Sequence, residues 1–308
     1  MSATAASASV PAPDESTPIR RGKGRRWTSY ILPLYSWLVI ITLSVPVFVM
    51  IAFSFNNPSG RQNIEWQGFT IDNYTQIMDQ TEIVDSIKLS LEIAVVATVI
   101  ATALGTLLGI AIGRYRFRGS GGANYLVFLA IASPEIVLGT SLLTLFANRL
   151  KFIPLGFYSI VIAHVMFCLS FVAVTVRARV QGLNPSMEEA AQDLGANPVV
   201  TFIKVTLPLI MPGIISGALL AFALSIDDFV ITYFVSGSTQ TFPLLIFGAQ
   251  KVGVGPSFNV IGTFLFAIGA LVALFGSILP NLTARRDAKR LAQDRSSRIE
   301  FDAVGMGL

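Results

Sequence analysis

Residues 186–208 read SMEEAAQDLGANPVVTFIKVTLP and lie in a polar insert between two long apolar runs of this 308-residue chain. Ser186 and Glu189 have the spacing of a capping box, in which the serine caps a helix and the glutamate reaches back to it. Gly195 provides the residue type that commonly ends a helix. The stretch therefore predicts a short helix that begins at Ser186 and ends before Gly195.

A second helix is expected directly after this one. Asn197-Pro198 places proline in the first helical position, where its missing N–H is not needed. We expect this helix to continue to Leu207 and to stop at Pro208, at the entrance of an apolar run. A short helix held between firm turns and tied to a membrane helix suits the transmission of rigid-body movement.

The rest of the chain is unusually poor in charge. Charged residues make up 13% of the chain and apolar residues 53%, whereas an ordinary soluble domain has about 25% charged residues. The runs without any charge are 27–60, 93–113, 152–176, 205–226 and 252–284, and the run 119–148 contains only Glu135. Each approaches or exceeds the roughly 20 residues of a membrane-spanning helix. These runs exclude a soluble enzyme, a disordered chain and a disulfide scaffold, and they predict an all-α polytopic membrane protein.

We predict six transmembrane helices, at about 30–55, 91–113, 124–148, 159–176, 209–235 and 259–279. The six-helix domain covers residues 27–280 and includes a cytoplasmic loop at 177–208. Residues 1–26 and 281–308 are expected to be basic cytoplasmic tails, the first of them disordered. A loop with an interfacial helix is expected at 56–88, and a re-entrant or interfacial segment at 242–258.

The distribution of basic residues predicts the orientation. With the N-terminus in the cytoplasm, 17 Lys and Arg residues lie inside and five outside. The positive-inside rule therefore favours cytoplasmic N- and C-termini and a cytoplasmic 177–208 loop. Arg114, Arg116 and Arg118 are interpreted as solvated determinants of this topology, so the formal charge of +4 is not taken to indicate nucleic acid.

Two predicted spans carry small residues at four-residue intervals, which places these residues on one face of a helix. In lipid, such faces allow helix backbones to approach closely. The two series are Ala97, Ala101, Gly105, Gly109 and Gly113, followed by Gly213, Gly217, Ala221 and Ser225.

The 186–208 stretch resembles the EAA loop of ABC importer permeases. The resemblance is carried by Glu189-Ala190-Ala191, Gly195 and the closing Leu207-Pro208, located between the fourth and fifth of six spans. It implies the type I importer permease fold, in which the short helix is a coupling helix that docks into a cytoplasmic ATPase subunit. Under that reading Ala190 and Ala191 permit close docking, and Glu189 offers a charge to a basic ATPase residue.

Four further stretches resemble the spermidine/putrescine permeases within this family. They are Trp66–Thr70, Arg114–Gly119, Ser133–Val137 and Ser225–Val230. The resemblance implies a complex with a second, different permease, two ATPase subunits and an extracytoplasmic polyamine-binding protein, in the bacterial inner membrane. Glu135 stands where that group often has Asp, and Asn73 where an aromatic residue often precedes the tyrosine, so the exact polyamine stays open.

The residues themselves favour a cationic substrate. Carboxylates are costly inside a membrane span and usually face a cavity or the bundle interior. The candidates for the substrate path are Glu135, Ser225, Asp227 and Asp228. On a continuous helix Asp228 shares the small-residue face with Ser225, and Asp227 points about 100° away. Asp228 is therefore our first choice for the acid that faces the path, and Asp227 the second.

Other interpretations of these acids remain open. Glu135 either contributes to the path, pairs with an arginine of a partner subunit, or accepts backbone hydrogen bonds freed by Pro134. Asp227 and Asp228 either line the path or lie in the outer headgroup region. The same fold also serves permeases for other solutes, such as an opine, an amino-acid derivative or ferric iron, and a stand-alone secondary transporter is a further alternative.

No catalytic, cofactor or metal site is expected. The chain has no phosphate-binding Gly-x-x-x-x-Gly-Lys-Ser/Thr motif, and its single histidine, His164, cannot supply a nucleophile–base–acid set. Cys168 lies four residues after His164, but two such residues do not make a metal site, and we expect the cysteine to be a small buried hydrophobe. ATP hydrolysis would belong to partner subunits.

Overall fold

The computed structural model describes residues 28–60, 62–271 and 274, so both predicted tails lie outside the described residues. All of its named elements are helices, apart from one isolated bridge between Asn56 and Phe69. The chain divides into two compact units, residues 1–49 and 50–308. Helix α1 (Thr28–Ser54) is apolar and contains Pro33 and Pro46 without a break.

Four helices of the described chain are long and apolar enough to cross a membrane, or up to five if one bent pair forms a single span. The four are Tyr30–Ser54, Thr81–Arg114, Phe157–Gln181 and Pro198–Ile226. They correspond to the predicted first, second, fourth and fifth spans. The predicted sixth span is described only as the apolar helix Pro256–Leu271, and most of its remainder lies outside the described residues.

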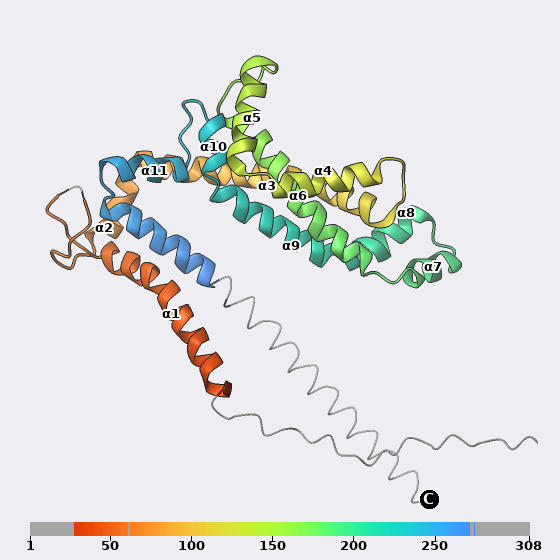
Figure 1. The fold of residues 1–308 in the computed structure, drawn as a ribbon, viewed down its shortest axis with the longest axis horizontal. Helices are drawn as coiled ribbons and strands as arrows, with labels where there is room; N and C mark the ends of the chain where they lie inside the picture. The colour runs from red at the N-terminus through yellow and green to blue at the C-terminus, as the bar shows by residue number, and fades with distance from the viewer. Residues whose placement is uncertain (1–27, 61, 272–273, 275–308) are drawn as a thin grey trace, which may run out of the picture. The chain divides into compact units, whose positions relative to one another are not determined.

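Three of these helices pack together as the core of the second unit: α3 (Thr81–Arg114), α6 (Phe157–Gln181) and α9 (Leu207–Ile226) (Figure 1). A Cβ atom added to Gly109 on α3 would lie 2.7 Å from the carbonyl oxygen of Ala173 on α6. On α9, a Cβ atom added to Gly213 would lie 2.8 Å from Cβ of Arg179. Both predicted small-residue faces are therefore contact faces, and the contact lies within this chain.

The predicted third span is not one helix. It consists of α4 (Ser120–Ala132) and α5 (Glu135–Asn148), bent by 108° at Ser133 and Pro134. Proline disfavours a helical conformation in the residue before it. Ser133 accordingly has an extended backbone, with φ −71° and ψ 133°. The break makes Glu135 the first residue of α5.

The predicted fifth span is also interrupted. Helix α9 ends at Ile226 and a separate helix, α10 (Val230–Val235), follows after three residues. Helix α10 packs against α5 and α6. Asp227 and Asp228 therefore lie in a break and not on a continuous helix.

The remaining elements lie around the predicted polar segment 56–88. They are the short helix α2 (Asp72–Thr75), a 3₁₀ turn (Gln76–Asp79) and the start of α3 at Thr81, ten residues before the predicted span. Helix α11 (Phe242–Val252) occupies the predicted 242–258 segment. Its buried Phe242 and Leu245 pack with Ile77 and Ile83, so this segment joins the polar loop to the membrane helices.

Candidate functional site

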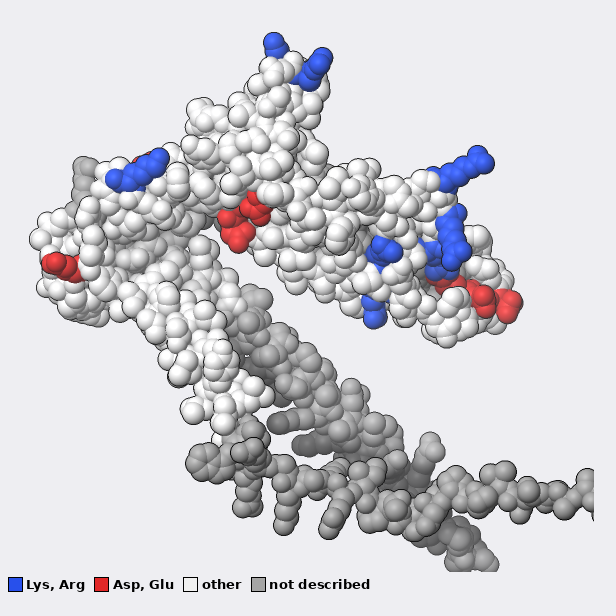
Figure 2. Space-filling view, viewed as in Figure 1, with Lys and Arg blue, Asp and Glu red and all other residues white. Residues whose placement is uncertain are grey.

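The two helix breaks bring the three predicted acids together. Glu135 begins α5, Asp227 and Asp228 lie between α9 and α10, and α5 packs against α10. Glu135 lies close enough to both aspartates to interact with them electrostatically. Figure 2 shows an acidic patch on the surface near the end of α9.

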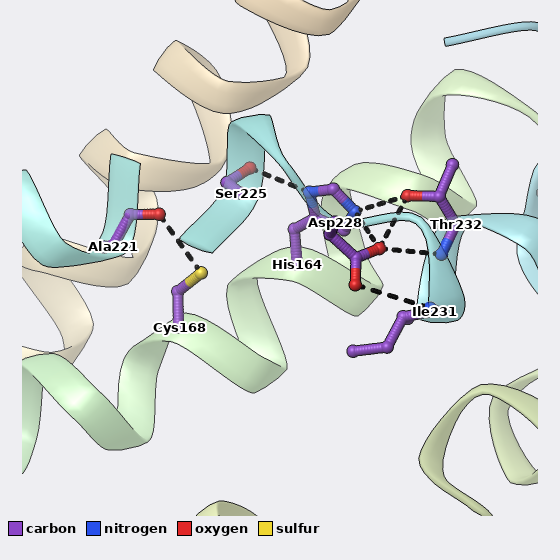
Figure 3. A network of polar contacts seen from close by, with 7 residues as sticks. All are labelled: His164, Cys168, Ala221, Ser225, Asp228, Ile231 and Thr232. Carbon is purple, nitrogen blue, oxygen red and sulfur yellow. Dashed lines mark hydrogen bonds and ion pairs between the residues drawn. The ribbon is translucent and has the colours of Figure 1, made fainter. Parts of the chain in front are cut away.

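Asp228 is the centre of a buried hydrogen-bond network (Figure 3). Its Oδ2 atom accepts hydrogen bonds from the backbone N–H of Thr232 at 2.8 Å and from the hydroxyl of Thr232 at 2.7 Å. Its Oδ1 atom accepts a longer bond from the N–H of Ile231 at 3.4 Å. The carboxylate thus caps the first turn of α10, where the N–H groups have no partner within the helix.

His164 of α6 ties both sides of the break together. Its Nδ1 atom lies 2.7 Å from the hydroxyl of Ser225, in the last turn of α9. Its Nε2 atom lies 2.8 Å from the hydroxyl of Thr232 and 3.2 Å from Oδ2 of Asp228. The histidine therefore holds the end of α9 and the start of α10 at one point of α6.

This geometry reverses the predicted order of the two aspartates. The side chain of Asp228 is 4% exposed, and Ser225 is also buried and bonds to His164. Asp227 and Glu135 are exposed. The premise of a helix that continues past Ile226 is wrong, and the small-residue face of α9 contacts α6. The geometry therefore favours Asp227 over Asp228 for the path, and which acid faces the path stays a prediction.

Sequence reasoning missed His164 and Thr232 as part of this site. The available signal was a single histidine inside a charge-free run, since a buried imidazole needs hydrogen-bond partners. Cys168, one turn further along α6, is fully buried, as predicted. Within the described residues, no group of three or more His, Cys, Asp and Glu side chains is arranged to hold a metal ion.

The predicted cytoplasmic segment folds largely as expected. Helix α7 (Ser186–Asp193) is followed by a turn at Gly195, whose φ of +85° is a left-handed conformation that favours glycine. Helix α8 (Pro198–Thr201) begins after Asn197, whose side chain accepts a hydrogen bond from the N–H of Val200 at 2.8 Å. These observations confirm both short helices and the turn between them.

Two details of the segment differ from the prediction. The capping box is absent, because α7 starts at Ser186 itself and the N–H of Ser186 donates to the side chain of Asn184 at 3.1 Å. The second helix does not stop at Pro208. It continues through a π turn (Phe202–Thr206) into α9, and the N–H of Leu207 bonds to the carbonyl of Phe202. The wider turn admits a proline, whose ring clashes with a carbonyl of the preceding turn in a regular helix.

Comparison with known proteins agrees with this architecture. Residues 105–292 match the family described as "Binding-protein-dependent transport system inner membrane component". The chain belongs to this permease family. The matched range contains α7, α8, both helix breaks and all four predicted path residues.

Several curated relatives of this permease are similar over most of their length. The chain is 39% identical over 251 residues to "Spermidine/putrescine transport system permease protein PotC" of Escherichia coli K12. The aligned region covers 81% of this chain and 92% of the relative. It is 37% identical over 274 residues to "Putrescine transport system permease protein PotI" of the same strain, covering 85% and 96%.

Solved structures show the same fold at lower sequence identity. A bacterial ABC transporter that imports the acidic polysaccharide alginate has a TM-score of 0.62 at 15% identity, covering 86% of this chain and 99% of that one. The methionine transporter MetNI has a TM-score of 0.52 at 16% identity, covering 63% and 92%. These likenesses support the all-α importer permease fold.

In this permease, adjacent glutamates of α7 have different surroundings. Glu189 and Ala190 are exposed, and Ala191 is half-buried. Glu188 is buried and forms a two-pronged ion pair with Arg114, the last residue of α3. The expectation that Arg114 is solvated is therefore wrong, because Glu188 of the predicted cytoplasmic loop engages its guanidinium. Its role in setting the topology stays a prediction.

Proposed function

We propose that this permease is the membrane subunit of an ATP-driven importer of polyamines such as spermidine and putrescine in the bacterial inner membrane. The observation that carries the proposal is the pair of exposed acids, Glu135 and Asp227, at two adjoining helix breaks in otherwise uncharged spans. A polyamine has several ammonium groups separated by methylenes, so neighbouring acids suit it as a passing ligand. The names of the PotC and PotI relatives support the same substrate class.

The path is proposed to lie along the free face of α9. Its small-residue face is occupied by α6, whereas Met211, Ile215 and Leu219 on other sides of α9 are exposed in this chain. A second permease (PotB-like) would cover this side and complete the path. A polyamine-binding protein (PotD-like) would deliver the substrate from outside the cytoplasm.

Helix α7 is proposed to contact one of two ATPase subunits (PotA-like). Glu189, Ala190 and Ala191 belong to this surface, and the turn at Gly195 sets its orientation. Leu194 is 89% exposed beside this turn and is proposed to belong to the same contact surface. ATP-driven closure of the ATPase subunits would move α7 and switch the path between its two openings. Both termini would then lie in the cytoplasm.

Uptake by the assembled complex tests the substrate. The full complex is reconstituted in proteoliposomes, with ATP on the side of the membrane that carries the ATPase subunits. Labelled spermidine bound to the polyamine-binding protein is added on the other side and should be transported across. Asp227→Asn and Glu135→Gln should each lower the initial rate about fivefold or more, because loss of one ionic contact costs about 1 kcal/mol or more. Asp79→Asn, an exposed acid of the polar segment, serves as the matched control.

The alternatives predict different results. A permease for an opine, another amino-acid derivative or ferric iron would import that solute and leave spermidine outside. A stand-alone transporter would import spermidine without the ATPase subunits. Wild-type-like uptake by the Asp227→Asn, Glu135→Gln double variant would contradict the proposed path.

A further inference from the structure

We propose that Glu188 and Arg114 are positioning residues that transmit the movement of α7 to the membrane helices. The inference rests on the proposed function only in that α7 contacts an ATPase. It goes beyond that function because it identifies the internal connection through which such a contact reaches the substrate path. Neither residue is expected to touch substrate or ATP.

The connection converges on one carboxylate. Oε1 of Glu188 lies 2.5 Å from Nη1 of Arg114 and accepts a hydrogen bond from the hydroxyl of Thr206, also at 2.5 Å. Oε2 of Glu188 pairs with Nη2 of Arg114. The carboxylate therefore joins α7 to the end of α3 and to the π turn at the base of α9.

Burial distinguishes this pair from an ordinary surface ion pair. The Glu188 side chain is 10% exposed and that of Arg114 is 32% exposed, and Thr206 is buried. Bidentate arginine–carboxylate pairs have a defined geometry, whereas solvated single contacts are weak and variable. By contrast, Arg116 and Arg118 form no ion pair or side-chain hydrogen bond within the described residues, so they offer matched controls.

Movement of α7 would reach the membrane helices through Glu188, because its carboxylate joins α7, α3 and the π turn at the base of α9. Helix α7 has eight residues and its backbone reaches α8 and α9 through the turn at Gly195, so the Glu188 contacts add a second connection to the membrane helices. Helices α3, α6 and α9 form one packed body, in which Gly109 and Gly113 bring α3 against α6. A displacement of Glu188 would therefore act on two members of that body at once, through Arg114 and Thr206.

The π turn gives the base of α9 a means of responding. Such turns are rare inside α-helices and often occur at functional positions. Thr206 is the last residue of the turn and supplies the third contact to Glu188. At its other end, α9 leads into the break that contains Asp227. Helix α9 thus connects the buried pair with the proposed path.

The test measures coupling and assembly separately. Glu188→Gln, Arg114→Gln and the charge-exchanged double variant, Glu188→Arg with Arg114→Glu, are assembled with their partners in proteoliposomes. We expect each single variant to lower the spermidine imported per ATP hydrolysed about tenfold, the upper part of the range for residues that modulate coupling between distant sites. The exchanged pair should recover a substantial part of that ratio, and Arg116→Gln should match the wild type.

A second measurement does not depend on the substrate. In a Cys168→Ser background, a thiol introduced by Asp227→Cys is labelled with a membrane-impermeant reagent, with and without ATP and vanadate. When Glu188 and Arg114 are intact, the labelling rate of the introduced thiol should change when ATP and vanadate trap the complex. Arg114→Gln should abolish this change. Arg114→Lys, which keeps the charge but not the two-pronged geometry, should give an intermediate change and covers the case in which Arg114→Gln does not assemble.

The outcomes separate this inference from the proposed function. If the wild-type complex imports no spermidine but its labelling still responds to ATP and depends on Arg114, the proposed substrate fails and the inference stands. If spermidine is imported and the single variants keep the wild-type ratio and labelling response, the inference is overturned. If the exchanged double variant lost as much spermidine import per ATP as the single variants, the inference would also be overturned. A requirement for the ion pair predicts that exchanging the two charges restores part of this ratio.

Discussion

Nε2 of His164 in α6 lies 3.2 Å from Oδ2 of Asp228, which is in the break between α9 and α10. The two residues are buried, and the contact joins α6 to the residue that caps α10. The break is therefore held by side-chain contacts from another helix. Its shape, and with it the position of Asp227, depends on His164.

Removal of His164 should destabilise the permease. His164→Ala leaves the carboxylate of Asp228 and the hydroxyl of Ser225 without one partner each, and unpaired buried groups cost about 1–3 kcal/mol. We expect a loss of about 2 kcal/mol in the free energy of unfolding, seen as a lower midpoint of thermal unfolding in detergent. Cys168→Ala, on the same face of α6, should cause a smaller loss, and equal losses would contradict a special role for the network.

The two aspartates should give opposite results when each is replaced by asparagine. Asp228→Asn loses hydrogen bonds to a charged group inside the protein, so it should lower stability by about 2 kcal/mol. Asp227→Asn should keep the wild-type midpoint, because Asp227 is exposed, while lowering spermidine uptake. Thermal unfolding and uptake by assembled complexes measure the contrast. An unchanged midpoint for Asp228→Asn would show that its network contributes little.

A single methyl group should disturb the packing of α3 on α6. Gly109→Ala would place Cβ 2.7 Å from the carbonyl oxygen of Ala173, a backbone atom that cannot swing away. Overpacking of this kind costs about 1–3 kcal/mol. Gly121→Ala is the matched control, because a Cβ atom there has no neighbour within 4 Å. Thermal unfolding should show a loss only for Gly109→Ala.

The turn after α7 should require a residue that tolerates left-handed backbone. Gly195 has φ +85° and open space around its Cα, so the expected effect of Gly195→Ala is backbone strain of about 1–2 kcal/mol without a clash. The strain should reorient α7 and weaken copurification with the ATPase. Gly195→Asn should be milder, because asparagine visits this conformation more readily. Equal binding by the glycine, alanine and asparagine forms would show that the turn does not set the orientation of α7.

Four of the spans, both packing faces and the two short helices of the 177–208 loop could be predicted from the sequence because each has a local cause. Charge-free runs indicate spans, four-residue spacing indicates a helix face, and Gly195 and Asn197-Pro198 indicate a helix end and a helix start. The bend at Pro134 also had a local signal, but the span 124–148 was predicted as one helix across that proline.

The break after Ile226 has a weaker local signal, since no Gly or Pro lies between Ser225 and Val230 and only Asp228 marks the start of a new helix. It depends on His164, which is 61 residues from Ser225 along the chain. Likewise, the choice between Glu188 and Glu189 as the buried residue depends on Arg114, 74 residues away. Neither outcome can be deduced from neighbouring residues alone, because a distant side chain contributes to each.

The π turn at Phe202–Thr206 also restricts which changes of chain length this protein tolerates. A π turn accommodates one residue more than a regular helical turn, and each residue of a helix corresponds to a rotation of about 100°. Deletion of one residue here would restore a regular helix but rotate either α8 or the glycine face of α9 out of place. The segment between Gly195 and Gly213 is therefore expected to accept substitutions far more readily than insertions or deletions, and related permeases should differ there in residue type while keeping the same spacing.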